Sequence, residues 1–488
     1  MPSRGRAWLR RAGCLIALLS LSGCAAFRSY NAELTGTLGE ASSGNLEAAI
    51  KTLEANNKGP HKDLLYYLEM GELQRLQDKY EASQKSWRFA QTSVQAWEAT
   101  AQTDPSKLAR DAASYVINDK VRPYEGHDYE KVMLTTGMAL NFLALGELDN
   151  ARVAIKQTHE LEAVIAELRS KETYEVEQEA RKRGAVTSFK ELNGYPVQSI
   201  DNPEVNALKN SYQSALSHYL AGFVYEALGE PSLAAAGYRQ AIELQPNQPQ
   251  LEQALAGLDQ RVAAPDDGLT DTLFVIGSGT APARESRQFP LPVPVNHTLV
   301  LIPVSFPVMQ ATSSGVLPGQ LEVDSADRVP VTPVTNIDVM ARRALKDEMP
   351  SIMLRGAIRS TAKAVTQYEL QRQAQHQNNG LLGLAAIAVT IGSVVTESAD
   401  ERTWRSLPDR IGIARMRLAP GTHTVTLGTP EGPHMFQVTV SGRHAVVGLR
   451  LMRGQLFVQA PVPSATMRAT NAARATPLPI PPPIPTEQ

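Results

Sequence analysis

The 488-residue sequence predicts a multidomain protein of α and α+β class, with a helical solenoid over residues 31–260 and a mixed domain over 269–460. Three observations support this division. Small and large apolar residues recur at helical-repeat spacing in the first part. After the boundary at 263–268 the pattern changes to short β-branched runs separated by turn residues. At about 150 residues per domain, the length also suits two to three domains.

Residues 1–23 have the organisation of a secretory signal peptide. A positive region with four arginines precedes an apolar stretch that is too short to span a bilayer. The segment ends in Leu21-Ser22-Gly23-Cys24, which resembles the lipobox of bacterial lipoproteins. We therefore predict that Cys24 carries the lipid, palmitate included, and that residues 24–30 form a tether. By the same resemblance, Ala25 in place of Asp implies sorting to the outer membrane, with the body facing the periplasm.

Charge and cysteine content restrict the function further. Lys+Arg total 48 and Asp+Glu total 50, so no cationic excess is present for a nucleic-acid partner. Of the 2 cysteines, Cys14 lies within the signal and lipidation consumes Cys24. The mature body therefore has no thiol for catalysis or metal binding. We expect no cofactor and no metal.

The clearest repeat unit runs from Tyr212 to Pro249 and has tetratricopeptide (TPR) spacing. Its defining residues are Gly222, Tyr225, Gly229, Ala234, Tyr238, Ala241 and Pro246. Gly222 and Ala241 allow two helices to approach closely, and Gly229 suits the turn between them. Weaker copies precede it, around Gly44, Gly71 and Gly146. The sequence thus predicts a TPR-like α-solenoid of about four helix pairs, whose groove, including Tyr225 and Tyr238, binds a partner protein.

Three segments interrupt these repeats. Residues 104–130 suit a helix and a loop, and residues 184–203 suit an irregular loop. Residues 158–183 extend a helix with dense charge. This extension is either a solvated face with ion pairs between successive turns or a docking arm.

The second domain opens with strand candidates at Thr272–Ile276 and Thr298–Val304. Frequent prolines between and after them favour edge strands and extended segments. Asn336 suits the cap of a helix over 337–348, and Pro350 suits the first turn of a second helix that ends near Gln377. Residues 380–395 carry no charge and form either a buried core helix or a helix that touches a membrane or partner.

The C-terminal part predicts strands and then a tail. Five short runs over 411–460, separated by turn residues, predict an antiparallel β-meander. Residues 461–488 are proline-rich and predict a disordered tail, which is either a spacer or a ligand for an aromatic groove.

The segment Thr396–Leu407 (TESADERTWRSL), with Pro408, resembles the signature of an uncharacterised family of bacterial TPR-containing outer-membrane lipoproteins. Segments like Ala139–Ala151, Pro350–Arg355 and Pro420–Val425 accompany it in that family. The resemblance covers most of residues 24–460. It implies an exported lipoprotein with repeats before an α+β domain, and it implies no established reaction. Related members accompany envelope lipoproteins that regulate peptidoglycan synthases.

Several short patterns partly match motifs of known chemical sites. Ser360 and Lys363 have Ser-x-x-Lys spacing without a following Lys-Thr-Gly, and Gly277-Ser278-Gly279 lacks the third glycine of a phosphate loop. His423 and His434 could meet across a hairpin. Turn or surface positions remain the simpler interpretation of these patterns.

The densest charged cluster surrounds Trp404. Glu397 and Asp400 could serve as the acid and base of a glycan-processing enzyme. Alternatively, they pair with Arg355 or Arg359 and lock two helices together.

The sequence as a whole predicts a non-enzymatic scaffold or adaptor for cell-envelope proteins. Binding would use the repeat groove or the region of Arg355, Arg359 and Trp404. The alternatives are an envelope glycan-processing enzyme that uses Glu397 and Asp400, or an accessory of secretion or surface-polymer export.

Overall fold

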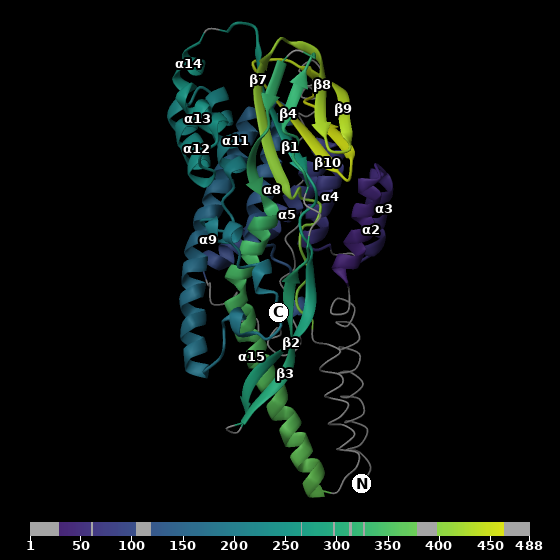
Figure 1. The fold of residues 1–488 in the computed structure, drawn as a ribbon, viewed down its shortest axis with the longest axis vertical. Coiled ribbons are helices and arrows are strands. Elements are labelled where there is room, and N and C mark those ends of the chain that lie inside the picture. Colours follow the sequence, from purple (N-terminus) through teal and green to yellow (C-terminus); the bar gives the residue numbers. More distant parts are fainter. Residues whose placement is uncertain are drawn as a thin grey trace, which may run out of the picture.

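The computed structural model describes residues 29–59, 62–103, 119–264, 266–295, 298–311, 315–325, 327–377 and 398–462. The fold is 53% helical and 22% strand, with a helical N-terminal region followed by a β-rich part, which confirms the mixed class (Figure 1). Cys24, Glu397, residues 380–395 and the tail beyond residue 462 lie outside the described residues. Among the described helices, none is long and apolar enough to cross a membrane.

Antiparallel helix pairs build the N-terminal region. Four such pairs lie within the described residues: α2 (Tyr30–Ser42) with α3 (Leu46–Asn56), α4 (Leu64–Leu76) with α5 (Tyr80–Thr103), α8 (Asp128–Ala144) with α9 (Leu148–Arg183), and α11 (Ala215–Ala227) with α12 (Pro231–Leu244). The shorter helices α10 (Pro203–Ala207), α13 (Pro249–Ala256) and α14 (Leu258–Ala263) complete the region. Each pair buries its apolar face against neighbouring elements in one continuous core.

The four pairs share one turn geometry. The turn residue has a positive φ in each: +86° at Gly44, +58° at Asp78, +72° at Gly146 and +73° at Gly229. The following N–H closes the turn on a carbonyl five residues back, as from Lys79 to Gln74 at 3.0 Å and from Glu230 to Tyr225 at 2.8 Å. This is the Schellman pattern, which satisfies the last carbonyls of a helix. Glycine suits the position because it adopts a positive φ without steric cost.

Glycines also let large side chains cross between paired helices. A Cβ atom on Gly71 would lie 2.2 Å from the Trp87 ring, and one on Gly222 would lie 2.5 Å from the Tyr238 ring. Trp87 is 1% exposed and Tyr238 is completely buried. Both residue pairs have the same sequence separation, from 71 to 87 and from 222 to 238. The predicted role of Gly222 in close helix approach is confirmed.

The predicted loop over 184–203 is irregular but anchored. It contains two short 3₁₀ turns, Phe189–Glu191 and Val197–Ser199. Ile200 is fully buried, and the Tyr195 hydroxyl donates a 3.0 Å hydrogen bond to the Pro307 carbonyl. The loop therefore joins the helical region to the β-rich part.

Two larger sheets form the body of the β-rich part. The first has the order β11 (Gln455–Gln459), β10 (His444–Met452), β1 (Thr270–Ser278), β7 (Arg410–Leu418) and β6 (Thr332–Asn336). The second has the order β5 (Asp327–Pro330), β4 (Gln320–Val323), β8 (Gly421–Thr429) and β9 (Gly432–Val440). β1 is buried on both faces: Phe274 and Ile276 face the second sheet, whereas Leu273 and Val275 join the helical core. This explains the continuous apolar run from Leu273 to Ile276.

The predicted meander over 411–460 is wrong in part: each predicted run is a strand, and β8 with β9 and β10 with β11 pair as antiparallel neighbours, but the five strands do not form one sheet. β10 pairs with β1 in parallel, with Phe274 opposite Val447. β8 and β9 belong to the other sheet, where β8 pairs with β4. Turn residues reveal where strands end, but burial of β1 on both faces decides which strands become its neighbours.

A long helix and a long hairpin extend from this body. β2 (Arg284–Val295) and β3 (Thr298–Met309) pair as an antiparallel hairpin, and α15 (Ile337–Gln377) runs beside them (Figure 1). The predicted break at Pro350 is wrong, because α15 continues through it. Interior proline costs about 3 kcal/mol, and the complete burial of Met349 and Met353 on its two sides offsets that cost.

The segment after residue 397 links both regions. Trp404 is completely buried and meets Trp87 edge to face, with 5.9 Å between ring centroids. One apolar cluster runs from Leu34 in α2 to Phe457 in β11. The two predicted domains therefore share a hydrophobic core.

Candidate functional site

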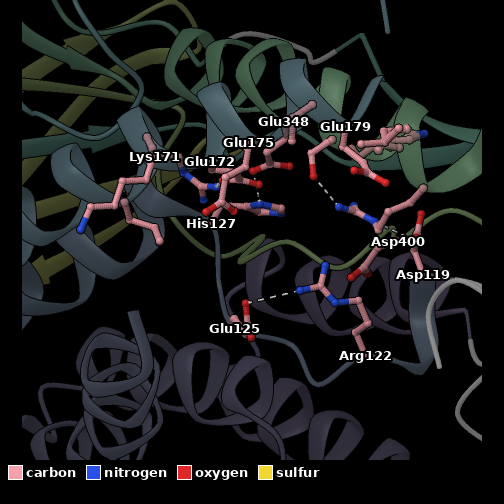
Figure 2. Close-up of a pocket in the computed structure, with 18 of the residues that line it drawn as sticks. Asp119, Arg122, Glu125, His127, Lys171, Glu172, Glu175, Glu179, Glu348 and Asp400 are labelled. Atoms are coloured by element: carbon pink, nitrogen blue, oxygen red, sulfur yellow. Dashed lines mark hydrogen bonds and ion pairs between the residues drawn. The ribbon is translucent and has the colours of Figure 1, made fainter. Parts of the chain in front are cut away.

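The candidate site is a cavity of about 1000 Å³ between α9, α15 and the loop 119–127. Figure 2 shows Glu172, Glu175 and Glu179 of α9 among the residues that line it, together with His127, Glu348 and Asp119. The remaining wall comes from Trp97 of α5, Lys131 of α8, Arg284 of β2, Pro307 of β3 and Asp400. The cavity thus forms where the charged extension of α9 packs beside the long helix of the β-rich part.

Glu348 lies at the centre of a buried ion cluster. His127 Nδ1 is 2.9 Å from its Oε1, and Arg284 Nη1 donates to its Oε2 at 2.8 Å. Burial would raise the pKa of the Glu348 carboxyl, but the charges of Arg284 and His127 hold that pKa well below its usual range. Each partner comes from a separate element: α15, the residue preceding α8, and β2.

His127 also fixes the segment that follows residue 397. Its Nε2 is 3.1 Å from the Arg402 carbonyl, and its ring stacks on Tyr129 with 5.9 Å between centroids. Both ring nitrogens therefore have a partner. The imidazole serves to position the cavity wall.

Arg284 has one free edge. The side chain is 2% exposed, and its Nε and Nη2 have no hydrogen-bond partner, although Nη1 binds Glu348. Burial would lower the pKa of this guanidinium, but Glu348 raises it above its ordinary value, so the group is a permanent cation. A buried donor without an acceptor is unfavourable. Arg284 therefore differs from the other charged residues of the wall, whose buried polar atoms have partners among the described residues.

A second ion cluster closes the side of the cavity. Arg169 of α9 donates to Asp128 through Nε at 2.6 Å and through Nη2 at 3.0 Å. Lys131 lies 3.3 Å from the same carboxylate, and its Nζ is 3.5 Å from the centroid of the Trp97 ring. Burial opposes ionisation of Asp128, but the charges of Arg169 and Lys131 lower its pKa. These contacts bind α9 to α8.

The outer part of α9 is strongly charged. Ion pairs between successive turns include Lys171 with Glu167 at 2.6 Å and Arg183 with Glu179 at 2.5 Å. These side chains are about half exposed, as the solvated-face interpretation predicts. The same helix supplies one cavity wall, so its charged face is also available to a ligand.

The predicted pairing of Asp400 with Arg355 or Arg359 is wrong. Asp119 is their partner instead, at 3.5 Å from Arg355 Nε and 3.4 Å from Arg359 Nη1. Asp400 accepts two hydrogen bonds from Arg402, from Nε at 2.8 Å and from Nη2 at 2.7 Å. The reason is proximity: Arg402 lies two residues away, whereas Asp119 comes from the insertion between α5 and α8.

Ion pairs hold the Glu348 and Asp400 carboxylates in their ionised form. Burial would raise the pKa of Asp400, but the charge and hydrogen bonds of Arg402 lower it. The pKa of Glu348 is lowered as well. A general acid at neutral pH needs a raised pKa, so neither of these carboxylates matches that role. Glu397, the other predicted catalytic carboxylate, lies outside the described residues.

Most sequence-predicted binding residues are in the core. Tyr238 and Trp404 are completely buried, Arg359 is 1% exposed and Tyr225 is 5% exposed. Only Arg355 of the five lines the cavity. The prediction that Tyr225 and Tyr238 face an open groove is therefore wrong, because Gly222 leaves room for Tyr238 inside its own helix pair.

The other candidate patterns do not meet in the structure. His423 pairs with Val438 across β8 and β9 rather than with His434, and its Nδ1 lies 2.6 Å from Asp324 Oδ2. Ser360 is buried within α15, and Ser278 ends β1. In the described part of the chain, no group of three His, Cys, Asp or Glu residues could hold a metal ion.

The sequence analysis missed His127, Arg284 and Glu348. No local motif marks them, since His127 and Glu348 lie 221 positions apart and Arg284 and Glu348 lie 64 apart. Arg284 is the first residue of β2, and the charged residues Glu285 and Arg287 follow it in the same strand, so charge alone did not single it out. Comparison with protein-family models, curated proteins and solved structures finds no match for this chain.

Proposed function

We propose that this protein is a lipid-anchored scaffold or adaptor of the bacterial cell envelope, without enzyme activity, and that it binds a segment of a partner protein in the cavity between α9 and α15. The observation that carries the proposal is the cavity itself. Its volume of about 1000 Å³ suits a short peptide segment, and both charge signs line it. The pKa values of Glu348 and Asp400 in its wall are lowered by ion pairs, which does not suit a general acid.

A TPR-like solenoid is part of this proposal. The shared turns support it, because Gly44 and Asp78 are 34 positions apart (44 to 78), the length of a TPR unit. The equivalent contacts of Trp87 and Tyr238 with glycines of the preceding helix support it as well. In such solenoids, the helix pairs position a binding surface rather than perform chemistry.

The lipid anchor is the second part of the proposal. The signal peptide and the lipobox ending at Cys24 support attachment to the outer membrane with the body in the periplasm. Labelling of cells with radioactive palmitate tests the anchor. We expect label in the wild type and none in Cys24→Ser, and retained label in the variant would contradict the anchor.

Photo-crosslinking in living cells tests the binding site. A photoreactive amino acid is placed at Glu175, which lines the cavity, and separately at Met435, which is 69% exposed on β9. We expect the Glu175 position to give one discrete adduct with an envelope protein and the Met435 position to give none. No adduct from Glu175, or the same adduct from both positions, would contradict binding in the cavity.

Charge reversal distinguishes binding of the partner in the cavity from non-specific binding elsewhere on the surface. Glu175→Lys changes the sign of one wall residue, and Glu204→Lys makes the same change at an exposed position of α10. Co-purification of the crosslinked protein should fall with the first variant and remain with the second. Equal recovery with both variants would place the partner elsewhere.

A further inference from the structure

The β2–β3 hairpin continues beyond the body of the protein without any charge. Leu291 and Val304, each 1% exposed, fix its base in the shared core. Beyond this base, residues 292–301 continue as strands that pair only with each other among the described strands, toward the end of the molecule where α15 ends (Figure 1). No Asp, Glu, Lys or Arg occurs between Arg287 and Glu322. Neither face of the hairpin therefore has the charged side chains that suit a strand to water.

Three prolines determine the outer edge of β2. Pro290, Pro292 and Pro294 alternate along the strand, so their backbone nitrogens all face the same edge. Because proline cannot donate to the ladder, this is the edge that faces away from β3. It offers no N–H donor over this length, which opposes the addition of another β-strand. The missing donors also lower the cost of an apolar environment, so this edge suits lipid better than a protein strand.

The predicted tether brings a membrane within reach of the hairpin. Tyr30 and Ser286 lie on the same part of the protein: the Arg402 guanidinium is 5.9 Å from the centroid of the Tyr30 ring, and the Ser286 N–H donates to Glu401 at 3.3 Å. Six positions (24 to 30) separate the proposed lipid from Tyr30, so the membrane surface lies at most about 20 Å away. β2 covers about 30 Å between Ser286 and Val295. The hairpin is therefore long enough to reach the headgroups.

We propose that residues 292–301 lie in the headgroup region of the membrane that carries the lipid anchor and form a second membrane contact. An open strand edge is not stable within the hydrocarbon region, so the contact stays interfacial. Asn296 and His297, which separate the two strands, are polar and suit that depth. The inference rests on the lipid anchor of the proposed function and adds the part of the folded chain that touches the bilayer.

Fluorescence quenching in vesicles tests the contact. Lipidation consumes Cys24, so an introduced cysteine is the one thiol of the mature protein. An environment-sensitive dye is attached to Thr298→Cys at the start of β3 and, separately, to Met435→Cys on β9, at the opposite end of the molecule (Figure 1). The full-length lipidated protein is placed in vesicles of phosphatidylethanolamine and phosphatidylglycerol that contain doxyl-labelled lipid.

We expect the vesicles to quench the dye at position 298 and not the dye at position 435. A doxyl group near the headgroup should quench more strongly than one at the end of the acyl chain, since the contact is interfacial. No quenching at position 298, or equal quenching at both positions, would overturn the proposal.

A charge in the hairpin provides a second test. Val300→Asp is introduced into the protein labelled at position 298, and the ratio of inserted to free hairpin should fall about tenfold, as expected for loss of one buried valine. Val316→Asp is the matched control, because Val316 is 56% exposed and lies outside the hairpin. Unchanged quenching in folded Val300→Asp would overturn the proposal. If this variant does not fold, the comparison of positions 298 and 435 still decides.

Failure of this inference is distinguishable from failure of the lipid anchor. Palmitate labelling that requires Cys24, without quenching at position 298, would keep the anchor and remove the hairpin contact. Quenching at position 298, together with palmitate label that persists in Cys24→Ser, would keep the contact and remove the anchor. The adduct from Glu175 tests the adaptor separately from both.

Discussion

The backbone N–H of Trp404 donates a 2.7 Å hydrogen bond to Oε1 of Glu130, although the two residues are 274 positions apart. Glu130 is completely buried at the start of α8 and also accepts from the Tyr124 hydroxyl at 2.5 Å and the His127 N–H at 3.1 Å. One carboxylate thus joins the cavity loop, the helical region and the segment after residue 397. This contact holds the two parts of the protein in register.

Replacement of Glu130 by Gln should destabilise the fold strongly. The side-chain amide substitutes a donor for one of the acceptor oxygens, so at least one buried donor loses its partner. Such a loss costs about 1–3 kcal/mol in the free energy of unfolding. Urea denaturation measures it. Glu204→Gln on exposed α10 is the control and should change stability by less than about 0.5 kcal/mol. Equal stability of both variants would contradict this role of Glu130.

Stability should depend on pH through Glu69. This fully buried residue of α4 accepts hydrogen bonds from the backbone N–H groups of Arg405, at 2.6 Å, and Ser406, at 3.2 Å. Burial raises the pKa of its carboxyl from 4.5 to about 7. The folded state therefore binds more protons than the unfolded state between these values. The stabilising contribution is complete below about pH 4.5 and is lost as the pH rises through 7, by up to about 3 kcal/mol.

Comparison with Glu69→Gln isolates this effect. The amide does not titrate, so the difference in unfolding free energy between wild type and variant should change between pH 5 and pH 8. Asp409, whose pKa burial raises to about 6, also titrates in this range but is present in both proteins. A difference that is constant with pH would show that Glu69 does not titrate there.

Alanine should be poorly tolerated at Gly222. Its Cβ would lie 2.5 Å from the buried Tyr238 ring, so the helices must separate at a cost of about 1–3 kcal/mol. Gly39→Ala in α2 is the matched control, because nothing lies within 4 Å of its added Cβ. That variant should be stabilised by about 0.5–1 kcal/mol, since alanine has the better helix propensity. Thermal unfolding of both measures the contrast, and a shift in the same direction for both would contradict it.

Asp119 should be the structural partner of the α15 arginines. Asp119→Ala leaves Arg359, which is 1% exposed, without this carboxylate, and loss of one member of a buried ion pair costs about 3–5 kcal/mol. Asp149→Ala removes an exposed pair with Arg152 and should have little effect. Guanidinium denaturation of the two variants tests this. An effect of Asp119→Ala no larger than that of Asp149→Ala would assign the stabilisation of Arg355 and Arg359 to other groups.

The helix pairs and strands could be predicted because their signals are local. Gly146 and Gly229 mark turns that need a positive φ, and the apolar run of β1 marks a strand buried on both faces. These patterns follow from backbone sterics and from burial of residues a few positions apart. The mixed fold class, the turn at Gly229 and the charged extension of α9 could all be predicted from such local patterns.

The cavity could not be predicted from the sequence, because it depends on which elements pack together. His127, Arg284 and Glu348 come from three separate elements. The local sequence around each is equally compatible with a solvent-exposed side chain. The same limit explains the errors at Tyr238, Pro350 and Asp400, where packing, burial and a nearer partner outweighed the local pattern. Amino-acid order decided the turns, helices and strands of this protein through short-range sterics. Long-range packing decided its ion pairs and its candidate binding site, since a charge acquires its role from the neighbours that folding brings to it.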